Sequence, residues 1–171
     1  GHPGDRPLLE SGDQRVLGEV GGELDVAGHP GEGADEAGGL GPPRGDDGPR
    51  AGVAVRGAAA ALAADKDIKF VAFVHAETST GVLSDAREIC AVAARHGAMV
   101  IMDAVTSLGG VPVLIDEWGV DAVYSGTQKC LSCPPGLSPV SFSARAIEHI
   151  KNRKTKVLSW FLDVTQVMAY W

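Results

Sequence analysis

The sequence predicts an α/β domain with a mostly parallel sheet flanked by helices. Two observations predict this class. From residue 58 onward, short apolar runs alternate with helix-forming stretches, which is the order of β–α–β units. The apolar runs are continuous, without regular alternation with polar residues, which indicates strands that are covered on both faces, as in a parallel sheet.

The first elements of this pattern are a helix, a strand and a second helix. Residues 58–64 are rich in alanine, the residue with the highest helix propensity, and residues 70–75 form the first apolar strand. Ser84 is expected to cap a helix that reaches about His96, because a serine side chain accepts a hydrogen bond from the first helical turn. Asp85 favours the positive end of this helix, and the glycine after His96 is expected to end it.

Three further strands and a last helix complete the expected order. Residues 98–102 form a second buried strand that ends at Asp103, and residues 121–125 form a third. A fourth strand is expected at about 138–142 and a helix at 144–153. Ligands of such domains collect where the carboxyl ends of parallel strands meet.

Polar residues follow three of these strands and are candidates for a ligand site. They are His75 through Thr80, Asp103, and Ser125 through Lys129. Polar loops are also common at strand ends without any site, so this pattern by itself leaves both interpretations open. A buried, hydrogen-bonded histidine is the simplest interpretation of His75.

Residues 1–57 differ in composition from the rest of the chain. Residues 1–56 contain no Phe, Tyr, Trp, Ile, Met or Cys, and Gly and Pro interrupt any helix or strand spacing. Such a segment cannot bury enough apolar surface to offset its ordering entropy, so we expect no packed core before about residue 52. Two interpretations remain, a disordered Gly-rich extension or GC-rich DNA translated in a shifted frame. The glycines form no phosphate-binding motif.

Charge, apolar runs and cysteines exclude several classes of partner. A net charge of −7 provides no basic surface for nucleic acid, and no apolar run approaches the roughly 20 residues that span a bilayer. Three cysteines without a signal peptide suit reduced thiols in the cytoplasm, with the peroxisome as the alternative in a eukaryote. Cys130 and Cys133 have C-x-x-C spacing but no second pair, so no metal site is expected.

Asp103 and Lys129 are residues of the two types that one class of cofactor needs. Pyridoxal-phosphate catalysis requires an amine that bonds to an aldehyde and a carboxylate that keeps a pyridine ring protonated. A carboxylate at the end of a buried strand is costly without a partner, so Asp103 is more than a solvated acid. Taken singly, the ordinary alternatives are a loop cap for Asp103 and a surface position for Lys129.

Several motifs occur in a characteristic order along the chain. They are His75–Val82, Met102–Gly110, Tyr124–Lys129, Pro134–Gly136, Arg153–Lys156 and Trp160–Asp163. In this combination the chain resembles the class V, fold-type I aminotransferases, and within them the alanine–glyoxylate and serine–pyruvate aminotransferases. The resemblance covers roughly residues 58–171 and implies the large domain of a three-layer fold-type I enzyme, here incomplete.

The resemblance implies roles for five residues. Lys129 would hold pyridoxal 5'-phosphate as a Schiff base and then shuttle a proton between the substrate α-carbon and the cofactor. Asp103 would pair with the pyridine nitrogen, and Val105 would pack against a face of the ring. Thr78 would hydrogen-bond the phenolic oxygen of the cofactor, and Gln128 would help to hold its phosphate.

The implied reaction is transamination of alanine or serine with a 2-oxo acid such as glyoxylate or pyruvate, by a homodimer in the full-length form. The family's phosphate-binding turn and substrate-binding arginine have no match in this chain, so we expect negligible turnover from it alone. The alternatives are a non-catalytic truncated fragment and another class V reaction such as cysteine desulfuration. Cys130, adjacent to Lys129, is badly placed for the mobile cysteine of that reaction.

Overall fold

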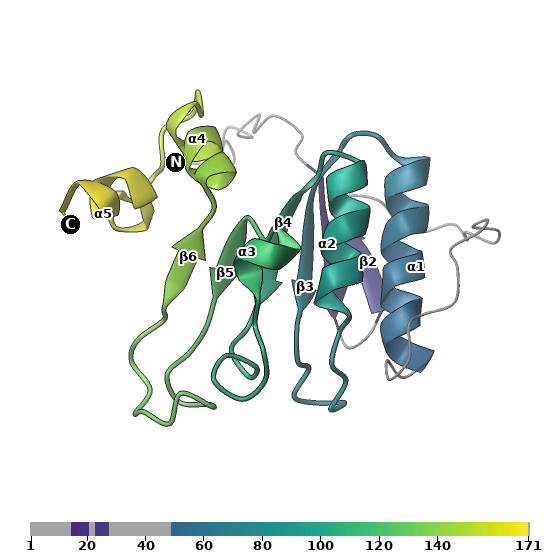
Figure 1. The fold of residues 1–171 in the computed structure, drawn as a ribbon. Helices are drawn as coiled ribbons and strands as arrows, with labels where there is room; N and C mark the ends of the chain where they lie inside the picture. Colours follow the sequence, from purple (N-terminus) through teal and green to yellow (C-terminus); the bar gives the residue numbers. More distant parts are fainter. Residues whose placement is uncertain (1–14, 21–22, 28–48, 171) are drawn as a thin grey trace, which may run out of the picture.

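A single six-stranded sheet organises the structure, a computed structural model that describes residues 15–20, 23–27 and 49–170 (Figure 1). The strands lie in the order β2-β1-β3-β4-β5-β6. They are β1 (Arg15–Val20), β2 (Glu23–Ala27), β3 (Ile68–Val74), β4 (Met99–Asp103), β5 (Ala122–Tyr124) and β6 (Val140–Phe142). The four central strands are parallel to one another, whereas β2 and β6 run antiparallel to their neighbours at the two edges. The predicted mostly parallel α/β sheet is confirmed.

Five α-helices and one 3-10 helix accompany the described strands. They are α1 (Pro49–Ala64), α2 (Ala86–Arg95), α3 (Ile115–Trp118), α4 (Ala144–Lys151), η1 (Trp160–Leu162) and α5 (Val164–Tyr170). Helices α1 and α2 lie side by side across one face of the sheet, and α4 lies near the end of β6 (Figure 1). Helices α3, η1 and α5 had no counterpart in the sequence prediction, because elements of three to seven residues show almost no periodicity.

The segment with unusual composition contains more regular structure than its sequence indicates. Strands β1 and β2 lie within residues 1–57, and β1 pairs in parallel with β3. Helix α1 begins at Pro49 instead of residue 58, with proline in the first turn, where its missing N–H costs nothing. Residues 1–14, 21–22 and 28–48 lie outside the described residues, and the domain boundary near residue 58 and the shifted reading frame remain predictions.

The core lies between the sheet and helices α1 and α2. Side chains of the central strands alternate between two faces, and Val71, Phe73, Val100 and Met102 are all at most 3% exposed on the helical side. Leu62 of α1 packs into the same cluster. Burial of each such large side chain stabilises the fold by about 1.5–3 kcal/mol, which outweighs the low helix propensity of the glycines within α1.

Helix α2 is capped by Asp85, and the prediction that Ser84 caps it is wrong. The Asp85 carboxylate accepts a hydrogen bond from the Glu88 backbone N–H at 3.0 Å. The Ser84 hydroxyl is buried and donates to the Val74 carbonyl at 2.7 Å, so it satisfies the end of β3 instead. Gly97 ends the helix with a positive φ of 73°, as predicted, because glycine adopts this conformation without steric cost.

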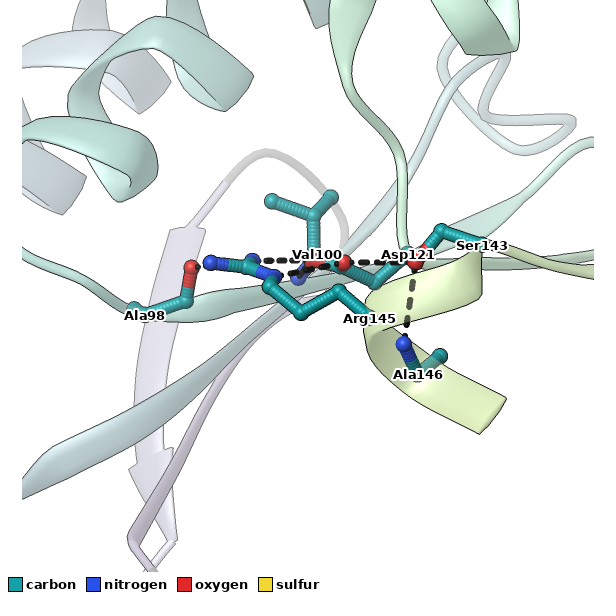
Figure 2. Close-up of polar contacts among 6 residues, drawn as sticks. All are labelled: Ala98, Val100, Asp121, Ser143, Arg145 and Ala146. Carbon is teal, nitrogen blue, oxygen red and sulfur yellow. Dashed lines mark hydrogen bonds and ion pairs between the residues drawn. The ribbon is translucent and has the colours of Figure 1, made fainter. Parts of the chain in front are cut away.

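A buried carboxylate joins the amino ends of β4 and β5 to the start of α4 (Figure 2). Asp121 is 3% exposed and accepts hydrogen bonds from the Val100 N–H at 2.8 Å and the Ser143 hydroxyl at 2.9 Å. Arg145 forms an ion pair with it through two nitrogens, and the same guanidinium donates to the Ala98 carbonyl at 3.0 Å. Four donors therefore compensate for the removal of this charge from water.

The ion pair predicts a large effect of Arg145→Ala on stability. This change leaves the buried Asp121 carboxylate without its cation, so we expect the free energy of unfolding to fall by about 2–4 kcal/mol in chemical denaturation. Arg87→Ala, at an exposed position on α2, is the matched control and should change it by less than about 0.5 kcal/mol. Equal effects of the two changes would contradict the role of the ion pair.

Asp121 also predicts a pH dependence of stability. Burial acts to raise the pKa of Asp121, but hydrogen bonds from Arg145, Val100 and Ser143 outweigh it and leave the pKa below the ordinary value. The stabilisation is therefore complete above the unfolded-state pKa of about 4 and is lost as the pH falls through the lower folded-state pKa. Asp121→Asn should show a smaller loss of stability between neutral and acidic pH than the natural chain. Parallel pH profiles of the two proteins would contradict the assignment.

Candidate active site

The carboxyl ends of β3, β4 and β5 lie next to one another, and the loops that follow these strands form the candidate site (Figure 1). The strand ends are joined by backbone hydrogen bonds. The His75 N–H donates to the Asp103 carbonyl, and the Ala104 N–H donates to the Tyr124 carbonyl, each at 2.9 Å. The three strand ends that the sequence analysis singled out therefore lie in one row.

Asp103 ends β4 with both carboxylate oxygens hydrogen-bonded. One oxygen accepts from the Val105 backbone N–H at 2.8 Å, and the other accepts from the Tyr124 hydroxyl at 2.8 Å. Burial raises the pKa of Tyr124 to about 12, and the hydrogen bond and charge of Asp103 act in the same direction. Since a carboxylate can accept about four hydrogen bonds, Asp103 retains capacity for a further donor.

The loop after β3 is a compact turn with Thr78 at its exposed tip. The Gly81 N–H donates to the Glu77 carbonyl at 2.8 Å, and Gly81 has a positive φ of 70°. The Glu77 carboxylate accepts from the Ser79 N–H and hydroxyl, each at 2.8 Å, which lowers the pKa of Glu77. The hydrogen bonds of Glu77 therefore stabilise the turn, and Thr78 is exposed to solvent on it.

The loop after β5 carries Gln128 and Lys129 on an exposed turn, which two buried hydroxyl residues hold in place. The Ser125 hydroxyl donates to the Ala104 carbonyl at 3.0 Å, and the Thr127 hydroxyl donates to the Pro134 carbonyl at 2.7 Å. Ser125 and Thr127 are buried, whereas Gln128 and Lys129 are exposed. No hydrogen bond or ion pair among the described residues occupies the Lys129 amine, which leaves it available for chemistry.

Two further contacts tie the three loops together. The Thr106 hydroxyl donates to the Ala76 carbonyl, and the Cys130 thiol donates to the Thr106 carbonyl at 3.2 Å. Gly110 lies against this thiol so closely that a Cβ there would approach the sulfur to 2.7 Å. Thr106 thereby joins the turn bearing Thr78 to the turn bearing Lys129, although sequence reasoning gave it no role.

His75 is buried as predicted, with 3% of its surface exposed, and its ring meets Trp118 edge to face at a centroid distance of 5.3 Å. Burial lowers the pKa of His75. The predicted hydrogen bonding is not found at Nδ1, which has no partner within the described part of the chain. Backbone hydrogen bonds to Asp103 and Ser84 hold the position of His75, and its ring packs against the indole.

The five predicted residues are distributed over the three loops at this edge. Asp103 and Val105 are joined by a direct hydrogen bond, while Thr78 and the pair Gln128 and Lys129 lie on the neighbouring turns. Sequence reasoning missed Tyr124, which is opposite Asp103 in the β4–β5 register. Its position directly before the Ser125–Lys129 stretch was visible in the sequence, but only the strand register identifies it as the partner of Asp103.

The candidate site thus combines a parallel sheet, an anchored acid at the end of β4, and a lysine in the next loop whose amine has no hydrogen-bond or ion-pair partner among the described residues. The aminotransferase class-V family matches residues 55–164 of this chain. The chain belongs to this family.

Similar proteins include alanine–glyoxylate aminotransferases. The enzyme of Rattus norvegicus is 41% identical over 97 residues, which are 57% of this chain and 23% of the relative. The enzyme of Drosophila melanogaster is 42% identical over 96 residues, which are 56% of this chain and 24% of the relative. The crystal structure of alanine–glyoxylate aminotransferase from Nostoc sp. matches with a TM-score of 0.64 and 43% identity, over 67% of this chain and 30% of that chain. The chain spans about a quarter of the length of the curated relatives it matches.

The cysteines provide a test of the loop arrangement. Cys130 and Cys133 are exposed, whereas Cys90 is buried, and burial raises its pKa to about 12. A thiol reagent should therefore label two cysteines in the folded chain and a third only after denaturation, because the thiolate is the reactive form. Cys130→Ser should reduce the native count to one. Rapid native labelling of Cys90 would show that the packing of α2 on the sheet is wrong.

Proposed function

We propose that this chain carries the cofactor-binding core of an aminotransferase that uses pyridoxal 5'-phosphate. The proposed reaction is transamination of alanine or serine with a 2-oxo acid such as glyoxylate or pyruvate. Family membership and the similarity to alanine–glyoxylate aminotransferases support this reaction class. Because the chain spans only about a quarter of these relatives, the activity is proposed for the enzyme that contains this core.

The observation that carries the proposal is that an oriented acid and a lysine amine without a partner among the described residues lie at neighbouring strand ends. Asp103 is held by Val105 and Tyr124, and it would receive the protonated pyridine nitrogen of the cofactor. Lys129, on the adjoining loop, would hold the cofactor through its aldehyde. When bound, the cofactor supplies a ring that accepts electrons from the substrate α-carbon.

Lys129 has two tasks in this proposal. Its amine would hold the cofactor through the aldehyde, and once released it would move a proton at the substrate α-carbon as a general base and acid. The hydrogen bonds of Ser125 and Thr127 support this role, because they fix the loop before Lys129 and tie it to Pro134 after Lys129, without involving the lysine side chain. Positioning of this kind contributes several kcal/mol toward a reactive geometry.

Three other residues are proposed as cofactor contacts. Val105, half-buried directly after Asp103, would pack against a face of the ring. Thr78 would donate to the phenolic oxygen from the tip of its turn. Gln128 would contribute to the phosphate site, and its side chain lies over Gly126, where a Cβ would come within 2.7 Å of the amide oxygen. A side chain at position 126 would therefore displace the flexible end of Gln128 from this placement.

The proposed partners are small molecules and a second copy of the full-length chain, with no nucleic acid or membrane partner. No helix in the described ranges is long and apolar enough to cross a membrane. The cytoplasm is the proposed compartment, with the peroxisome as the eukaryotic alternative.

Cysteine desulfuration is the second candidate reaction, and one observation weighs against it. A cysteine desulfurase from Thermococcus onnurineus is similar at a TM-score of 0.51 but only 22% identity, which supports the shared fold alone. The Cys130 thiol donates to the Thr106 carbonyl and packs against Gly110. These contacts hold the Cys130 thiol against the loop that follows β4, whereas desulfuration needs a mobile cysteine that can reach the substrate.

Reductive trapping tests the proposed cofactor residue. Borohydride treatment of the chain with pyridoxal 5'-phosphate should place a stable label on Lys129, detected by peptide mapping, and Lys129→Ala should abolish it. Lys66→Ala is the control and should leave the label in place, because the Lys66 amine instead donates to the Leu62 carbonyl at 3.3 Å. Equal labelling of Lys66, Lys151 and Lys154 would contradict the assignment and favour the alternative of a non-catalytic fragment.

A further inference from the structure

Tyr124 and Asp103 face each other across the pair of strands β4 and β5. They are direct partners in the parallel register, and the Tyr124 hydroxyl donates to one Asp103 carboxylate oxygen at 2.8 Å. The other oxygen accepts from the Val105 N–H at the same distance. Val100 and Met102 face the helical core, so by strand alternation Asp103 lies on the opposite face, together with Tyr124.

Two hydrogen bonds at different oxygens determine the orientation of a carboxylate. The bond from Val105 alone restrains one oxygen and leaves the plane of the group able to turn about it. The bond from Tyr124 restrains the second oxygen, and it comes from a stiff ring whose backbone is paired to β4. Hydrogen bonds to an ionised carboxylate are about twice as strong as those between neutral groups, so this restraint is substantial.

We propose that Tyr124 is a positioning residue that orients the Asp103 carboxylate toward the ring nitrogen of the cofactor. The Tyr124 hydroxyl donates to one lone pair of the Asp103 carboxylate and leaves others for the ring N–H, so both donors are accommodated. The part concerning the cofactor depends on the proposed function, whereas the hydrogen bond itself does not. Two measurements separate these parts.

The first measurement uses the titration of Tyr124 without any cofactor. The chain contains two tyrosines, Tyr124 and Tyr170, so in a Tyr170→Phe background the tyrosinate absorbance reports Tyr124 alone. We expect its midpoint near pH 12. Asp103→Asn should move the midpoint down toward the ordinary value of 10.0, because the negative charge beside the phenol is removed. An unchanged midpoint would overturn the proposal.

Alkaline unfolding could obscure this titration, so a fluorinated tyrosine at position 124 provides a second route. Fluorination lowers the intrinsic pKa of the phenol and moves the titration to milder pH. Asp103→Asn must still lower the midpoint, and circular dichroism at each pH verifies that the chain is folded. A folded protein whose midpoint does not respond to Asp103→Asn has no such hydrogen bond, and the proposal fails.

The second measurement compares the affinity for pyridoxal 5'-phosphate with that for a deaza analogue whose ring nitrogen is replaced by carbon. Tyr124→Phe should weaken binding of the natural cofactor about tenfold, which corresponds to about 1.4 kcal/mol. It should leave the analogue unaffected, because no ring nitrogen meets Asp103. Tyr170→Phe, at a position that is 91% exposed, is the control and should change neither affinity.

The outcomes distinguish the inference from the proposed function. Equal weakening of both ligands by Tyr124→Phe would show that Tyr124 acts only through general structure, which overturns the positioning role. Failure of the natural chain to bind the cofactor through Lys129 would overturn the proposed function and the cofactor part of the inference. The tyrosinate titration would still decide whether Tyr124 holds Asp103.

Discussion

The buried carboxylate of Asp121 needs a cationic partner, and this requirement constrains the chain on both sides of the loop that carries Lys129. An unpaired charge in this position would cost several kcal/mol, so the chain must bring Ser143 and Arg145 back to it after leaving the site. Strand β6 pairs antiparallel with β5, and the connection between these two strands carries Lys129. The ion pair thus joins the chain just before β5 to the chain just after β6, on the two sides of that connection.

The polar groups at the carboxyl ends of the strands are arranged differently from the Asp121 cluster. There the hydrogen bonds tie loops to one another and leave reactive groups only partly satisfied. Thr106 bridges the first and third loops, Ser125 and Thr127 hold the base of the Lys129 turn, and Asp103 retains lone pairs for another donor. Rigid anchors beside incompletely satisfied groups are what a site needs if it is to bind a ligand without reorganising.

The relation of the chain to its family follows from the same arrangement. The family match covers residues 55–164, which contain the three loops of the candidate site and the Asp121 cluster. The family match thus includes the part that holds Asp103 and Lys129, while most of the length of the alanine–glyoxylate aminotransferases lies outside their similarity to this chain.

The order of strands and longer helices from β3 to α4 was predictable from sequence because apolar runs are local signals, and motifs of the same local kind led to the prediction of roles for Asp103 and Lys129. The exchange of roles between Ser84 and Asp85 was not predictable, since it depends on the Val74 carbonyl, ten residues away. Likewise Tyr124 gains its role only through the register that sets it opposite Asp103, and Asp121 only through Arg145. Burial and strand pairing between distant residues decide these contacts, and no local pattern encodes them.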